Sequence, residues 1–129
     1  MPRRLGQHFL VRSSVVHRIV NALDLKPGDP LLEIGPGKGA LTRLLAQRSG
    51  KLLLVEKDLN LAEEMRERLA GEAKVQVRAG DFLEIPWSEI KRELGANFKV
   101  VSNLPYQAAT AILITAVCQP KSRPMNVQA

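Results

Sequence analysis

The sequence predicts a doubly wound α/β fold, in which a parallel sheet is covered by helices on both faces. Two observations predict it. Short apolar runs of strand length alternate along the chain with segments whose apolar residues recur at helical spacing. The run 51–56 is apolar almost without interruption, as is typical of a parallel strand that is covered on both sides.

Each expected element has a local signal. Ser13 is suited to cap a helix, and Asp58 is suited to cap a later one. A turn is expected at 26–30, where two prolines flank Gly28-Asp29. The expected helices are about 13–23, 40–47, 59–69 and 108–118, and the expected strands are about 31–34, 51–56, 75–77 and 98–101.

Length and composition limit the class of protein. The chain has 129 residues, of which 45% are hydrophobic, so we expect one soluble domain with one core. The single cysteine, Cys118, excludes a disulfide framework and a cysteine-rich metal site, and no metal is expected. The N-terminus has no apolar signal segment, and the longest apolar run, 108–118, is too short for a bilayer. We therefore expect a cytoplasmic protein without a membrane segment.

The net charge of +6 indicates an anionic partner, with nucleic acid as the first candidate. A basic surface that only keeps the protein in solution is the alternative. Residues 1–12 are rich in cations, and they are expected to form a basic arm before the first helix.

The loops after the expected strands are where an open α/β sheet binds its ligands. In the first loop, Gly35, Gly37 and Gly39 allow a sharp turn and a close approach of a ligand to the backbone. The loop matches a dinucleotide-binding signature, so it does not by itself separate a nicotinamide cofactor from a nucleoside cofactor. A tight turn without a ligand is the alternative.

Carboxylates follow the second and third expected strands. Glu56 is suited to accept two hydrogen bonds from a ribose diol, although a solvated or salt-bridged acid is the alternative. Asp58 is more simply a helix cap. Asp81 and Phe82 are suited to bind an adenine amino group and to pack on its ring. A capped turn with Phe82 in the core explains the same two residues equally well.

The fourth loop, Asn103-Leu104-Pro105-Tyr106, carries the sharpest signal. The proline stiffens the backbone, so that the Asn103 side-chain oxygen and the Leu104 carbonyl can aim at one exocyclic amino group. Tyr106, which is the only tyrosine, is then suited to stack on the base that carries this group. A proline-stiffened turn alone does not explain the flanking Asn and Tyr.

These segments, in this order, resemble the ribosomal RNA adenine N6-dimethyltransferase family. The resemblance covers nearly the whole chain and rests on 5–10, on 33–42, on Glu56 before Asp58, on Gly80-Asp81 and on 103–106. The segment 5–10 (Leu-Gly-Gln-His-Phe-Leu) and the Asn-Leu-Pro-Tyr segment together separate this family from generic methyltransferases and from dehydrogenases.

The resemblance implies an enzyme with a Rossmann-like methyltransferase fold, truncated after about four strands, that uses S-adenosylmethionine. His8 stands where many members have Asn, and both residues can form a hydrogen bond. The residues implied to bind the cofactor are His8, Leu10, Gly35, Gly37, Glu56, Asp81 and Asn103. The implied catalytic residues are Asn103, Leu104, Pro105 and Tyr106, and the candidates for phosphate contact are Arg3, Arg4, Arg12 and Arg18.

The implied reaction is N6-dimethylation of adjacent adenines in small-subunit ribosomal RNA, carried out by a monomer on the immature subunit. Family members are longer and have a C-terminal helical domain, so residues 1–129 are expected to be the N-terminal part of the catalytic domain. Three alternatives stay open: a large-subunit methyltransferase of the macrolide-resistance type, a non-catalytic RNA-binding fragment, and an NAD-dependent dehydrogenase. The last explains only the glycine loop and Glu56.

Overall fold

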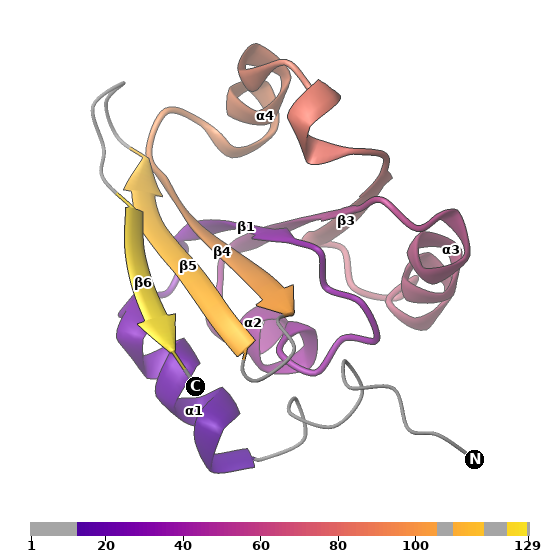
Figure 1. The fold of residues 1–129 in the computed structure, drawn as a ribbon. Coiled ribbons are helices and arrows are strands. Elements are labelled where there is room, and N and C mark those ends of the chain that lie inside the picture. Colours follow the sequence, from indigo (N-terminus) through magenta and orange to yellow (C-terminus); the bar gives the residue numbers. More distant parts are fainter. Residues whose placement is uncertain (1–12, 106–109, 118–123, 129) are drawn as a thin grey trace, which may run out of the picture.

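A computed structural model describes residues 13–105, 110–117 and 124–128 of the chain. Its centre is a six-stranded sheet with the strand order β3-β2-β1-β4-β5-β6 (Figure 1). The strands are β1 (Pro30–Ile34), β2 (Lys51–Glu56), β3 (Val75–Ala79), β4 (Phe98–Pro105), β5 (Thr110–Val117) and β6 (Pro124–Gln128). The helices are α1 (Ser13–Leu23), α2 (Thr42–Arg48), α3 (Leu59–Arg68) and α4 (Trp87–Leu94).

Strands β1 to β4 form a parallel sheet, which confirms the predicted α/β class. β1 lies between β2 and β4, with Leu32 opposite Leu53 on one side and opposite Val100 on the other. β3 continues the sheet beyond β2. Since parallel strands end at the same edge, this order brings the loops that follow β1, β2 and β3 together. The bounds of α1 and β2 agree with those predicted from the sequence.

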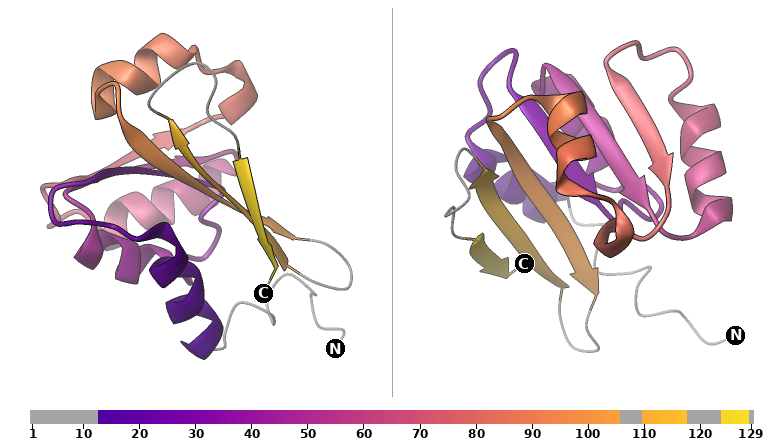
Figure 2. Two further views of the ribbon diagram at one scale, coloured as in Figure 1. Left: turned by 90° about the vertical axis from the view of Figure 1, so that its left-hand side faces the viewer. Right: turned by 90° about the horizontal axis from the view of Figure 1, so that it is seen from above.

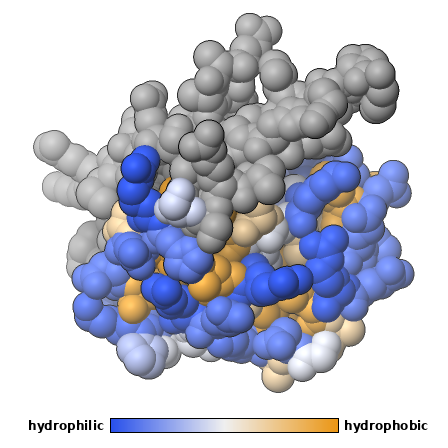
Figure 3. Space-filling view, turned by 90° about the horizontal axis from the view of Figure 1, so that it is seen from below, coloured by the Kyte–Doolittle hydropathy of each residue, from blue (hydrophilic) through white to orange (hydrophobic). Residues whose placement is uncertain are grey.

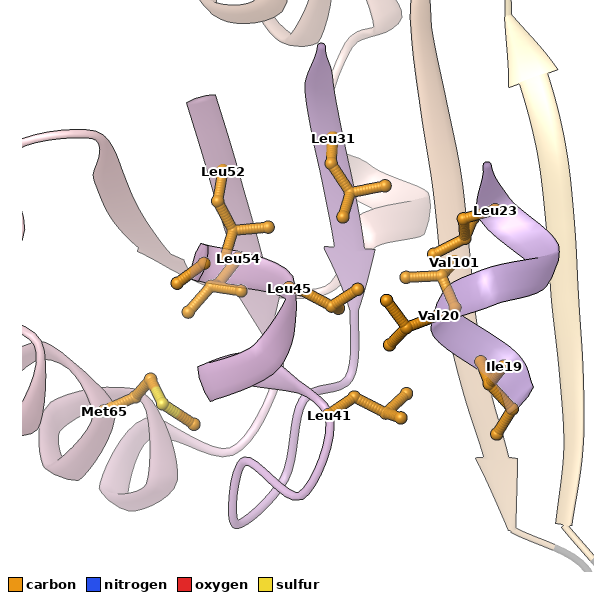
Figure 4. Packing of buried hydrophobic residues seen from close by; sticks show 11 residues of the cluster. Ile19, Val20, Leu23, Leu31, Leu41, Leu45, Leu52, Leu54, Met65 and Val101 are labelled. Carbon is orange, nitrogen blue, oxygen red and sulfur yellow. The ribbon is translucent and has the colours of Figure 1, made fainter. Parts of the chain in front are cut away.

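Alternation along the buried strands divides the core between the two faces of the sheet. On β2, Leu52 and Leu54 face one side, whereas Leu53 and Val55 face the other. The first side packs against α1, α2 and α3, whose apolar residues surround Leu31, Leu52 and Leu54 (Figure 4). The second side packs against α4 through Ile90 and Leu94. Figure 2 shows α4 on one side of the sheet and α1 and α2 on the other, as a doubly wound fold requires.

The structure contains a helix that was not predicted. Helix α4 carries Trp87, Ile90 and Leu94 at helical spacing after Pro86, and the last two are buried. A short 3-10 turn, Phe82–Glu84, precedes it. The interval between the third and fourth predicted strands therefore holds the helix that covers the second face of the sheet.

The prediction of a helix at 108–118 is wrong where the structure describes this segment. Residues 110–117 form β5, which pairs antiparallel with β4, and β6 pairs antiparallel with β5. Residues 110, 112, 114, 115 and 117 are β-branched, which favours an extended backbone. The sheet thus continues past its four parallel strands. None of the helices in the described parts of the chain is long and apolar enough to cross a membrane.

The fourth predicted strand was also too short. β4 runs through Ser102 and includes residues 103–105, which had been predicted as a loop. The backbone of Asn103 lies opposite Ile112 of β5, and that of Pro105 lies opposite Thr110. Pro105 is the last residue of the strand, a position where its missing N–H is tolerated.

Candidate functional site

The glycine loop after β1 turns the chain sharply toward α2. Gly35, Gly37 and Gly39 have φ angles of 70°, 60° and 89°, a region that L side chains rarely adopt. The Gly35 N–H donates to the carbonyl of Val55 at 2.8 Å, which holds the start of the loop against β2. The positive φ angles therefore explain why the sequence has glycine at each of these three positions.

Glu56 joins this loop to the turn after β2. Its Oε1 accepts from the N–H of Gly37 and its Oε2 accepts from the N–H of Asp58, both at 2.9 Å. The residue is 7% exposed and lies at the predicted place, the end of β2. Each carboxylate oxygen keeps a further lone pair, so Glu56 can hold the two loops and still accept a hydrogen bond from a ligand hydroxyl.

Glu33 is a second buried acid beside the loop, and sequence reasoning assigned it no role. It lies in β1 and is 1% exposed, and its Oε1 accepts from the Thr42 hydroxyl at 2.7 Å. Burial raises the pKa of Glu33 from 4.5 to about 7; the charge of Glu56 adds to the rise and the Thr42 hydrogen bond opposes it. Its Oε2 is buried and has no hydrogen-bond partner among the described residues. The sequence signal was an acid inside an otherwise apolar strand.

The other two acids of the site both cap turns. Asp58 Oδ1 accepts from the N–H groups of Asn60 and Leu61, which confirms its predicted role as the cap of α3. Asp81 Oδ1 accepts from the Leu83 N–H at 2.9 Å, while its Oδ2 lies 3.9 Å from Lys57 Nζ. Asp81 therefore forms the capped turn of the second interpretation, and its side chain remains 29% exposed at the edge of the sheet.

Phe82 belongs in part to the core. It is half-buried, and its ring meets the Trp87 ring edge-on at a centroid distance of 5.8 Å. Trp87 in turn lies 5.6 Å from Phe98. The aromatic group beside Asp81 is thus fixed by packing against α4 and β4.

Several predicted site residues lie outside the described part of the chain, namely His8, Leu10, Tyr106, Arg3, Arg4 and Arg12. For Asn103, Leu104 and Pro105 the structure describes the backbone, which continues β4. The pairing of β4 with β1 ends at Ser102, so among the described strands nothing pairs with the β1-facing edge of residues 103–105. Arg18 is exposed on α1.

The described part of the site is a set of acceptors at the ends of adjacent strands. Glu33, Glu56 and Asp81 come from β1, β2 and the turn after β3. Carboxylates bind hydroxyl and amino hydrogens, and a buried carboxylate without a partner favours a cationic group. Within the described residues, His, Cys, Asp and Glu side chains form no group that could hold a metal ion.

Solved structures with this arrangement are methyltransferases. The 23S rRNA methyltransferase ErmE matches with a TM-score of 0.57 and 31% identity over 75% of this chain and 48% of that one. A dimethyladenosine transferase from Plasmodium falciparum has the same fold, with a TM-score of 0.56 and 24% identity over 74% of this chain and 43% of that one. The fold is thus that of the Rossmann-like, S-adenosylmethionine-dependent methyltransferases.

The chain belongs to the ribosomal RNA adenine dimethylase family, whose model matches residues 2–127. It is 42% identical over 112 residues to the ribosomal RNA small subunit methyltransferase A of Geobacter metallireducens. The protein of that name from Parasynechococcus marenigrum is 45% identical over 113 residues. These matches cover 86% of this chain but only 41% and 36% of the two relatives, so the chain spans about two fifths of their length.

Proposed function

We propose that this chain carries the cofactor-binding part of an enzyme that dimethylates N6 of adjacent adenines in small-subunit ribosomal RNA. The observation that carries the proposal is the Glu56 carboxylate, fixed by two backbone N–H groups between the glycine loop and the end of β2, where the resemblance implies a cofactor site. Relatives named ribosomal RNA small subunit methyltransferase A support the choice of substrate. A single cysteine fits the reducing cytoplasm, and a basic composition fits an anionic partner. We assign a monomer as the active form and the immature small subunit as its target.

The described acids fit S-adenosylmethionine. We assign the ribose hydroxyls to the remaining lone pairs of Glu56 and the adenine amino group to Asp81. The buried Oε2 of Glu33 has no hydrogen-bond partner in the described part of the chain, and a cationic group of the ligand would supply one. His8, Leu10, Gly35, Gly37 and Asn103 are the other residues assigned to this ligand. When bound, S-adenosylmethionine supplies a methyl group that is electrophilic because it is attached to a positively charged sulfur.

We assign the substrate base to residues 103–106. The Asn103 side-chain oxygen and the Leu104 carbonyl would accept hydrogen bonds from the adenine amino group and orient its nitrogen. Among the described strands, none pairs with the β1-facing edge of β4 at residues 103–105, which leaves backbone groups available for such a contact. Pro105 stiffens this backbone, and Tyr106 would stack on a base that has been turned out of the RNA. Positioning then supplies much of the rate, and we assign no general base.

A transfer assay tests the activity. Small ribosomal subunits that lack the modification are incubated with radiolabelled S-adenosylmethionine and the wild-type chain, Asn103→Ala, or Glu67→Gln, which changes an exposed residue on α3. We expect label in the RNA with the wild type and the Glu67 variant and little with Asn103→Ala. Cofactor binding without transfer by the wild type would contradict the activity and favour the non-catalytic fragment.

Large-subunit RNA is the second candidate substrate, favoured by the likeness to ErmE. The same assay on protein-free large-subunit RNA separates the two candidates. We expect label only in the small subunit, and label only in the large-subunit RNA would assign the chain to the second activity.

A further inference from the structure

The two helices nearest the N-terminus carry charge of one sign only. α1 has Arg18 and α2 has Arg43 and Arg48, and neither helix contains an acid. α3 and α4 carry both signs, with three glutamates on α3 and two on α4. Between Glu33 and Glu56 the sequence has no acid at all. Among the four helices, α1 and α2 are therefore the two that carry only positive charge.

The cations of α1, of the glycine loop and of α2 are not neutralised by carboxylates. Elsewhere in the described residues, lysines and arginines form ion pairs, as in Lys51 with Glu93 and Arg78 with Glu89. No described carboxylate pairs with Arg18, Lys38 or Arg43, and all three are exposed. Surface cations that only serve solubility are commonly mixed with acids. An unmixed set of this kind produces a positive potential that attracts anions.

Two side-chain contacts connect the elements that carry these residues. Arg48 Nη1 contacts Asn21 Oδ1 of α1 at 3.2 Å, which places the ends of α1 and α2 side by side. Arg68 Nη1 contacts the Lys38 carbonyl at 2.8 Å, which links α3 to the glycine loop. Figure 3, the view from below, shows hydrophilic residues over most of the coloured surface, with apolar patches between them. We call the surface of α1, the glycine loop and α2 the cationic face, and it consists of Arg18, Lys38, Arg43 and Arg48.

We propose that the cationic face binds the phosphate backbone of the RNA substrate. The identity of the partner rests on the proposed function, and the position of the surface rests on the charges and contacts above. Lys38 lies in the glycine loop, so RNA bound to this face also reaches the carboxyl edge of the sheet. A membrane fits less well, because the large hydrophobic residues exposed in the described chain, Leu59, Leu83 and Trp87, lie on neither α1 nor α2.

Two double variants of equal charge test the proposal. Arg18→Gln/Arg43→Gln removes two cations of the cationic face. Lys91→Gln/Arg92→Gln removes two exposed cations from α4, on the other side of the sheet. Binding of each full chain to a fluorescent RNA hairpin is measured over a range of salt concentrations. Thermal midpoints and S-adenosylmethionine affinity, measured in parallel, should be unchanged in both variants.

The expected result is a difference in salt dependence. Each lost phosphate contact lowers the slope of log K against log salt by about 0.7–0.9, so the first variant should lower it by about 1.5. The α4 variant should have the same slope as the wild type. Equal slopes in both variants, or no RNA binding by the wild type, would overturn the proposal. So would binding to anionic phospholipid vesicles that exceeds binding to the hairpin and is lost in the first variant.

Failure of this inference is distinguishable from failure of the proposed function. A chain that binds the hairpin through Arg18 and Arg43 but transfers no methyl group contradicts the activity and supports the surface. A chain that transfers methyl groups but loses RNA affinity equally in both variants contradicts the surface and supports the activity.

Discussion

Glu33 couples the stability of the fold to pH. Its pKa is raised by burial from 4.5 to about 7, so between these values the folded chain holds a proton that the unfolded chain has released. The contribution of Glu33 to the free energy of unfolding is therefore greatest below pH 4.5, and it falls as the pH rises to 7. The loss amounts to about 3 kcal/mol for a shift of this size.

Urea unfolding of the wild type and of Glu33→Gln over this pH range measures the effect. We expect the variant to lack the wild type's fall in stability between pH 4.5 and 7, because its side chain does not ionise. Glu67→Gln, which changes an exposed glutamate on α3, should follow the wild type. Parallel pH profiles for the wild type and Glu33→Gln would contradict this account of Glu33.

Individual site residues were predictable where their roles follow from local sequence. Asp58 precedes a helix and caps it, and Glu56 lies at the end of an apolar strand. The pair of Glu33 and Thr42 was not predicted, because their contact depends on how α2 returns over β1 after the glycine loop. The sequence shows the buried acid, and only the fold shows its partner.

Among the helices and strands, α3 is stabilised by a side-chain cap at its first turn. The Asp58 side chain satisfies two backbone N–H groups of the first turn, so Asp58→Ala should lower the free energy of unfolding by about 1 kcal/mol. Asp58→Asn retains an acceptor oxygen and should lose less. Chemical denaturation of the two variants provides the comparison, and equal losses would show that the cap bond does not stabilise α3.

The segments that precede β1 and β2 pack closely against each other through their backbones. A Cβ placed on Gly50 would lie 2.2 Å from the Gly28 Cα, and the Gly50 N–H donates to the Asp29 carbonyl at 2.8 Å. Gly50→Ala should therefore cost about 1–3 kcal/mol in stability. Gly71→Ala is the matched control, since nothing lies within 4 Å of its added Cβ. A similar melting temperature for both variants would contradict this packing.

Two elements show where sequence patterns stop being sufficient. Trp87, Ile90 and Leu94 give α4 a clear helical period, which the sequence itself contains. At 110–117, a short apolar run fits a buried helix or a strand equally well by periodicity. Its β-branched residues and the edge that β4 offers for pairing agree with the strand that the structure has.

At the scale of the whole molecule, the strand order places the site. β1 lies at the centre of the parallel sheet, so the glycine loop is flanked by the ends of β2 and β4. Glu56 joins the glycine loop to the loop after β2 through side-chain oxygens. The cationic face covers the same side of the sheet as α1 and α2 and meets this edge at Lys38. One topology thus places the proposed cofactor site beside the surface that we propose for RNA.

Calorimetric titration of the chain with S-adenosylmethionine and with NAD tests the central claim most directly. We expect S-adenosylmethionine to bind at one site and NAD not to bind. In Glu56→Gln the affinity for S-adenosylmethionine should fall about tenfold or more, because the ligand loses a bond to a charged acceptor. Glu64→Gln, an exposed change on α3, should bind like the wild type. Tight NAD binding, or S-adenosylmethionine binding that is unchanged in Glu56→Gln, would contradict the account.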